Sequence, residues 1–201
     1  MRLLDKIKET LRDERGSFSI EAILMFPMLA WAFMAMFVFF EGLRESNINL
    51  KATYTVSDLL SRETELIDQT YLNGMNDIYA WLSRSANPVQ MRLTVVRYDA
   101  ATNSHIIEGC AKGINGKPDL EQEDIATVVT PHVPIMADAS TAIVVETWAT
   151  YTPIFDMGLT ETDIYNIVVT SPRFSDQLRC AGDGDGTGST HDDGDHQEEE
   201  L

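Results

Sequence analysis

The sequence predicts an α+β protein in which a single N-terminal transmembrane helix extends outward and is followed by a small antiparallel sheet with helices on one face. Three observations lead to this prediction. Residues 22–40 carry no charge, residues 41–84 show helical periodicity, and after Pro88 apolar and polar residues alternate. Helical segments followed by strands are typical of an α+β domain. The expected boundaries are a leader at 1–16, a transmembrane helix at 17–40, an exported domain at 41–180 and an acidic, disordered tail at 181–201.

The uncharged run from Ala22 to Phe40 is 19 residues long. A helix of that length reaches about 28 Å, close to the roughly 30 Å hydrocarbon core of a bilayer. Backbone polar groups must be paired in lipid, so we expect a helix here, which Pro27 bends without ending. A secretory signal peptide is the alternative, but its apolar region is shorter and ends in small residues. This run ends in 37–40, Phe-Val-Phe-Phe, which argues against removal of the segment.

Basic residues are distributed unevenly around the uncharged run. The leader carries Arg2, Lys6, Lys8, Arg12 and Arg15, whereas the twenty residues after the run carry Arg44 and Lys51. The positive-inside rule then places the N-terminus in the cytoplasm. We therefore expect the chain after residue 40 to lie outside the inner membrane, in the periplasm of a cell that has two membranes.

Glu21 directly precedes the uncharged run and follows Gly16 by five residues. A carboxylate at this position is costly if it enters the membrane alone, so it needs the interface or a cation. Gly16, Ser17 and Glu21, placed between a short charged leader and an apolar helix, resemble a prepilin peptidase site, which is cut after the glycine. Cleavage would create an ammonium group on Ser17, which Glu21 of a neighbouring subunit could pair with. The alternative is an uncleaved signal anchor whose Glu21 reaches the headgroups.

The segment Arg15–Glu21, the proline six residues after Glu21, and the segment 54–62 (Tyr-Thr-Val-Ser-Asp-Leu-Leu-Ser-Arg) resemble the TadE/TadG-like proteins. These are pseudopilins, or minor pilins, of the tight-adherence (Flp) pilus system. The resemblance covers about residues 12–84 closely and the remainder in outline. It implies a pilin-like long helix laid against a small sheet, processing by a prepilin peptidase, and other Flp pilus assembly subunits as partners. The chain departs from the family at Ala22, where many members have an aromatic residue.

Two apolar stripes at helical spacing follow the membrane segment. The first consists of Leu43, Leu50 and Tyr54, and the second of Leu66 or Ile67, Tyr71, Met75, Ile78 and Leu82. The second stripe stops at Asn87-Pro88, which is a helix boundary signal. We expect both stripes to face the domain core. An alternative for residues 41–60 is a helix-bundle interface with other pilin subunits.

The rest of the exported domain predicts strands. Apolar residues at 89, 91, 93 and 95 alternate with polar residues, as on one face of a strand, and 105–110 is expected to return as the second arm of a hairpin. The segments 140–151 and 163–170 are rich in β-branched and aromatic residues and predict two more strands. The character of the short element 120–130 stays open.

Charge excludes one class of partner. The formal net charge is −17, and the acidic residues extend through the exported domain and the tail. Nucleic-acid binding requires a basic surface, so we expect no nucleic-acid partner. The tail lacks the apolar residues needed to order itself. Its segment 183–189 resembles the start of a calcium loop, but position twelve is Gly194 instead of the bidentate glutamate, so no metal is expected.

Cys110 and Cys180 are the two cysteines of the chain, and both belong to the exported part. Disulfides persist outside the cytoplasm, so the pair is a candidate disulfide. Closing a loop of this length would stabilise the fold by about 4 kcal/mol on the loop-entropy model. Two free or separately paired thiols are the alternative. Two cysteines so far apart do not suggest a structural zinc site.

No sequence motif indicates catalysis. The chain has four histidines, His105, His132, His191 and His196, and it contains no nucleophile elbow, zinc-protease motif or phosphate loop. A histidine near a serine or aspartate in space remains compatible with the sequence. We expect no enzyme activity and no cofactor.

Overall fold

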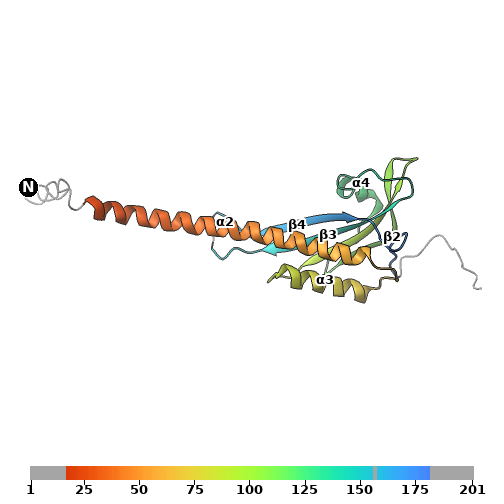
Figure 1. Ribbon diagram of the computed structural model, residues 1–201, viewed down its shortest axis with the longest axis horizontal. Helices are drawn as coiled ribbons and strands as arrows, with labels where there is room; N and C mark the ends of the chain where they lie inside the picture. The colour runs from red at the N-terminus through yellow and green to blue at the C-terminus, as the bar shows by residue number, and fades with distance from the viewer. Residues whose placement is uncertain (1–16, 156–157, 182–201) are drawn as a thin grey trace, which may run out of the picture.

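The computed structural model describes residues 17–155 and 158–181 and has the α+β fold that the sequence predicts (Figure 1). A long helix comes first, and a four-stranded antiparallel sheet with further helices follows. The elements are α2 (Ser17–Ser61), α3 (Gln69–Ser83), β1 (Gln90–Asp99), β2 (Ser104–Ile114), the 3-10 turn η1 (Gln122–Asp124), α4 (Ile125–Val128), β3 (Thr141–Tyr151) and β4 (Thr162–Thr170). We call the part from residue 41 onward the head. The predicted leader 1–16 and most of the predicted tail lie outside the described residues.

Helix α2 is continuous over 45 residues and contains Pro27 in its interior. Its first half projects alone from the head, and its second half lies across the sheet and beside α3 (Figure 1). At 1.5 Å per residue the helix is about 67 Å long, roughly twice the thickness of a hydrocarbon core. One helix therefore supplies both a segment long enough to cross a membrane and a structural element of the head.

The sheet has the strand order β2-β1-β3-β4, and all neighbouring pairs are antiparallel. Leu93 lies opposite Val145, which in turn lies opposite Val168. The hairpin of β1 and β2 contains an irregularity between Thr94 and Val96, where the register shifts. Strands β1, β3 and β4 fall where period-two alternation or β-branched residues predict them, and β2 is the predicted return arm of the hairpin but extends beyond residue 110 to Ile114.

The main core lies between the sheet and the two long helices. Residues of one parity on β1 and β3, including Leu93 and Val145, face Leu60 of α2 and Leu72 and Tyr79 of α3, and all five are buried. Successive strand residues point to opposite faces, which explains this parity.

A second, smaller core lies on the opposite face of the sheet. Val96 and Val144 pack there against Ile125 and Val129, from α4 and the residue that follows it. The two long helices do share one face, as predicted, but the segment 120–130 folds as η1 and α4 over the other face. Its few apolar residues lack a recognisable period, so the sequence left its structure open.

The prediction that Leu43 and Tyr54 of α2 face the core is wrong, because another face of the helix is buried. Leu43 and Tyr54 are 66% and 58% exposed, respectively. The buried face of this half carries the apolar residues Ala52, Val56 and Leu60 and, beside them, a row of polar residues at four-residue spacing, namely Asn49, Thr53, Ser57 and Ser61. Hydrogen bonds compensate part of this burial, because the Thr53 and Thr147 hydroxyls lie 2.7 Å apart and Tyr79 donates to Asn49 at 2.9 Å.

The second predicted stripe is confirmed in part. Ile67 and Met75 are buried, and Tyr71 and Leu82 pack partly buried against the core, whereas Ile78 is 36% exposed. The buried residues of α3 are Leu72, Met75, Asn76, Tyr79 and Ser83. Helix α2 ends at Ser61, and Asp68 starts α3 by accepting a hydrogen bond from the backbone N–H of Tyr71 at 2.7 Å, as an N-cap residue does.

Candidate functional site

The residues of the predicted processing site lie at the N-terminal end of α2. Glu21 belongs to the second turn of the helix and is exposed, and no described residue gives it an ion pair or a hydrogen bond. Ser17 is the first helical residue. Gly16 lies outside the described residues. The structure thus places an exposed carboxylate one helical turn after the predicted cleavage point.

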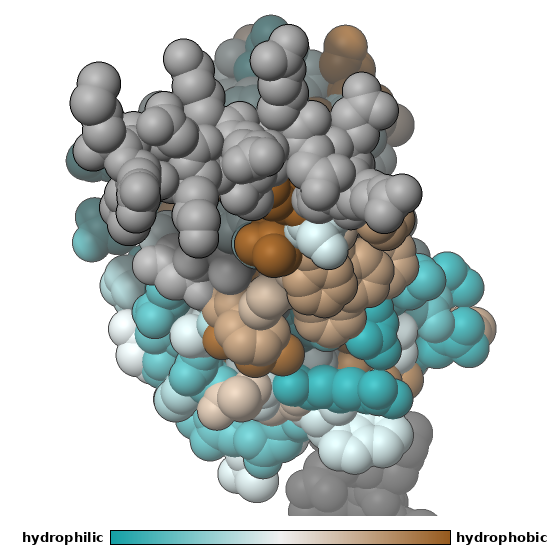
Figure 2. All heavy atoms as spheres, turned by 90° about the vertical axis from the view of Figure 1, so that its left-hand side faces the viewer, coloured by the Kyte–Doolittle hydropathy of each residue, from teal (hydrophilic) through white to brown (hydrophobic). Residues whose placement is uncertain are grey.

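Apolar side chains cover the helix beyond Glu21 on all sides. Ile23, Leu24 and Phe26 are 71%, 70% and 74% exposed. Among residues 17–155 and 158–181, α2 is the one helix that is long and apolar enough to cross a membrane. Viewed from the N-terminal side, apolar residues lie at the centre of the surface and hydrophilic residues of the head surround them (Figure 2). A helix that is apolar all round needs an apolar environment, which a bilayer provides.

The base of the head contacts α2 where the uncharged run ends. A Cβ added at Gly42 would lie 3.0 Å from the Leu159 side chain and 3.6 Å from the ring of Tyr151. Glycine therefore allows the connection between β3 and β4 to approach the helix closely. Beside this contact is an open cavity of about 370 Å³, whose lining includes Phe39 and Tyr165.

Cys110 and Cys180 form a disulfide, with their Cα atoms 5.1 Å apart. Both residues are buried, and backbone hydrogen bonds hold the segment around Cys180 in place. The Cys180 N–H donates to Gly109 at 3.1 Å, and the Ala181 N–H donates to Ile67 at 2.8 Å. The disulfide therefore ties the chain after β4 to β2, and the hydrogen bond to Ile67 ties it to the segment that precedes α3.

An ion pair that the sequence analysis missed lies on the sheet face opposite α2. Two nitrogens of Arg92 donate to Glu146 at 2.6 and 2.9 Å, and the Tyr165 hydroxyl donates to the same carboxylate at 2.8 Å. Burial, and then the hydrogen bond to Glu146, raise the pKa of Tyr165. Trp148 lies beside this group, with Lys117 Nζ 4.2 Å from its ring centroid.

The ion pair has a structural role. Glu146 is 1% exposed and three donor hydrogen bonds satisfy its carboxylate, so it is not available as a free acid or base. The signal in the sequence was a single acidic residue inside a strand of otherwise buried character. Such a residue requires a cationic partner. The partner, Arg92, is 54 residues away and cannot be identified from local pattern.

Each of the two histidines of the described head lies close to an oxygen atom of the segment 128–130. His105 is buried, its Nδ1 lies 3.2 Å from the Thr130 hydroxyl, and burial lowers its pKa. His132 Nδ1 lies 3.1 Å from the carbonyl of Val128. In the described part of the chain, no group of three or more His, Cys, Asp and Glu side chains could hold a metal ion.

The functional interpretation rests on the chain's own residues. No family model matches the chain, and neither a curated protein nor a solved structure matches it. The features that carry information are the segment around Glu21, the exposed apolar half of α2, and the disulfide-linked head.

Proposed function

We propose that this chain is a TadE/TadG-like pseudopilin that takes part in the assembly of a tight-adherence (Flp) pilus, after a prepilin peptidase cuts it behind Gly16. One observation carries the proposal. The segment Arg15–Glu21 leads directly into a continuous helix whose first half is apolar and exposed and whose second half packs on an antiparallel sheet. This order of a cleavable leader, an acidic residue, a membrane helix and a sheet-bearing head is what a pilin-like subunit requires.

Glu21 has a specific part in this proposal. Its carboxylate is exposed and borders the apolar run, where an uncompensated charge is unfavourable in lipid. Cleavage after Gly16 creates an ammonium group on Ser17, four residues from Glu21. When subunits stack through their apolar helices, the Ser17 ammonium of one subunit neutralises Glu21 of the next.

The topology follows from charge and from the disulfide. The basic leader stays in the cytoplasm, and the head lies in the periplasm. The disulfide between Cys110 and Cys180 supports this placement, because such bonds persist in oxidising compartments. The inner membrane therefore holds the subunit until assembly.

The N-terminus of the protein purified from membranes tests the proposal directly. Cells with a prepilin peptidase should yield a chain that starts at Ser17, and cells without it should yield the intact chain. Gly16→Leu should block the cut, whereas Gly74→Ala is a matched control, because nothing lies within 4 Å of a Cβ added at Gly74. An intact chain in both strains would contradict the proposal and favour an unprocessed signal anchor that presents a periplasmic binding or scaffold domain. A start beyond Phe40 would instead indicate a secreted protein.

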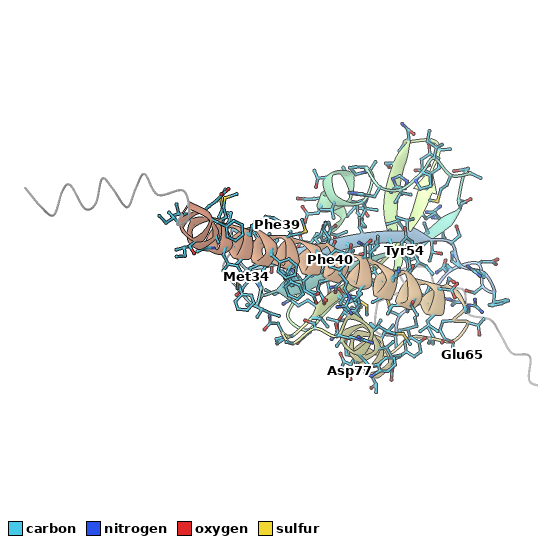
Figure 3. All side chains as sticks on the ribbon, turned by 60° about the vertical axis from the view of Figure 1, so that its left-hand side comes forward. Met34, Phe39, Phe40, Tyr54, Glu65 and Asp77 are labelled. Atoms are coloured by element: carbon cyan, nitrogen blue, oxygen red, sulfur yellow. A yellow bond between two sulfur atoms is a disulfide. The ribbon has the colours of Figure 1, made fainter. Side chains whose placement is uncertain are left out.

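Glu21→Gln separates the pilin-like subunit from the plain anchor. The variant should still enter the membrane but should abolish piliation, because the Ser17 ammonium loses its partner. Glu65→Gln is the control, since Glu65 is also exposed but lies at the far end of the head (Figure 3). A plain anchor would tolerate both substitutions.

A further inference from the structure

The connection between β3 and β4 lies along α2 on its membrane side. Tyr151 ends β3, and both Tyr151 and Leu159 lie against Gly42, so the residues between them begin and end at the level where the uncharged run ends. Figure 1 shows the described parts of this connection, 152–155 and 158–161, extending beyond the strand ends, alongside the helix and toward its N-terminal half.

The depth of this contact follows from the buried face of the helix. Val38 is 2% exposed, and Met34 and Ala35 are half-buried, although the rest of the uncharged run is open. These three residues share one helix face with Gly42 through spacings of three and four. Gly42 contacts this connection at Leu159, and burial on the same helix face extends down to Met34, about 9 Å below Phe40 along the axis (Figure 3).

Two neighbouring side chains of the connection are large and apolar, although Thr152, Thr160 and Glu161 of the same connection are polar. Ile154 is 70% exposed and Phe155 is 43% exposed. In water, nothing offsets the unfavourable free energy of exposing such apolar side chains. Beside the end of a membrane helix they are at a depth where lipid would cover them.

A second part of the head reaches the same level from α3. Trp81, near the C-terminal end of that helix, is 79% exposed. Arg84 and Glu45 line one hollow, and Glu45 lies five residues beyond Phe40, or about 7.5 Å along the axis. That height falls in the headgroup layer, where Trp is favoured.

We propose that the head rests on the outer surface of the bilayer, with Ile154 and Phe155 inserted among zwitterionic phospholipids and Trp81 at headgroup level. The inference rests on the membrane-spanning part of the proposed function. Its lipid class follows from charge, because the carboxylates of Glu41, Glu45 and Asp163 outnumber the guanidinium groups of Arg44 and Arg84 at this end of the head, and the excess negative charge repels an anionic leaflet. The contact fixes the head upright beside its own helix.

Spin labels on the full chain in phosphatidylcholine vesicles test this contact. Single cysteines replace Ile154 and, as a matched control, Ile135, which is 93% exposed. Ile135 lies in the loop of Asp138, which bonds the Ala100 N–H at the far end of the β1–β2 hairpin. The native cysteines are paired and do not react with a thiol reagent without reductant. A third label, Ala30→Cys, reports on the membrane span.

Collision rates with oxygen and with a water-soluble nickel chelate give the depth of each label. We expect the label at 154 to be several-fold less accessible to nickel than the label at 135, and to be buried less deeply in phosphatidylglycerol vesicles. Equal nickel access at 154 and 135, with 30 protected, would overturn this inference alone. Nickel access at 30 would overturn the membrane span itself. Deeper burial at 154 in the anionic vesicles would contradict the proposed lipid class.

Discussion

The two halves of α2 are one continuous helix with opposite surroundings. In the half that ends at Phe40, large apolar side chains are exposed, as Phe26 at 74% shows. In the half that follows, the buried face combines apolar residues with polar ones, and Leu60 and Thr53 are both fully buried. A helix pairs its backbone groups internally in either setting. The second half can bury both apolar and polar residues because the sheet offers it apolar contacts and hydrogen bonds, whereas the first half is long and apolar enough to cross a membrane and lies open along most of its length.

The largest expected effect comes from the disulfide, which acts on the head and not on the membrane half. Cys110→Ala combined with Cys180→Ala should lower the free energy of unfolding of the head by about 4 kcal/mol, because the unfolded chain loses a loop constraint. Denaturant titration of the full chain in micelles, followed by near-ultraviolet circular dichroism, measures it. The variant should remain in the membrane fraction. A loss of membrane retention would show that the two halves of α2 are not independent.

An arginine substitution in each half of α2 should affect membrane insertion in the first half only. Ala30→Arg should disfavour membrane insertion by about 3 kcal/mol, because a guanidinium near the middle of a span is poorly solvated. Thr55→Arg is the matched control, since Thr55 is exposed on the second half. Carbonate extraction of membranes measures retention. Equal retention of both variants would mean that the first half does not cross the bilayer.

The polar contact beneath the second half has a smaller expected effect. Thr53→Val should destabilise the head by about 1–3 kcal/mol, because it leaves the buried Thr147 hydroxyl without the oxygen that lies 2.7 Å away. Thr53→Val together with Thr147→Val should recover part of this loss, since neither hydroxyl is then left unpaired. Thermal or denaturant unfolding of the two single variants, Thr53→Val and Thr147→Val, and of the double variant measures the coupling. A double variant as unstable as the sum of the single variants would show that the hydroxyls do not interact.

The smallest expected effect concerns a group away from α2. Burial lowers the pKa of His105 in the folded head, so the unfolded chain takes up its proton first as the pH falls through about 6.5. The stability contributed by the neutral imidazole is therefore present above that pH and is lost as the pH falls toward and through the folded-state pKa. His105→Phe should flatten the dependence of unfolding free energy between about pH 7 and pH 5. Parallel curves for the variant and the unchanged chain would contradict this assignment.

The local sequence pattern is sufficient to predict most of the helices and strands. The alternation around Leu93 predicts β1, and the β-branched run that includes Val145 predicts β3. These strands alternate because one face meets the long helices, so their period is visible in the sequence. The uncharged run predicts the exposed half of α2 because apolar residues occur on every face of this part of the helix.

Prediction failed where contacts between distant residues determine the outcome. Ranking side chains by hydrophobicity selected Leu43 and Tyr54 for the core of the head, whereas Thr53 occupies it through its contact with Thr147. The Arg92 and Glu146 pair joins two strands that are distant in sequence. Of the candidate site, the sequence predicts Glu21 and suggests the disulfide, but not the apolar connection at the base of the head.

The disulfide also has a mechanical consequence. Ala181 follows directly on Cys180, which is bonded to β2 through Cys110. A force that pulls on the chain beyond Ala181 enters the sheet through this bond, and the segment from residue 171 to residue 179 carries no tension. The strand β4 is thus shielded from peeling by its own C-terminal extension. If a partner grips the subunit by that extension, the load reaches β2 directly while the packing of α2 on the sheet stays intact.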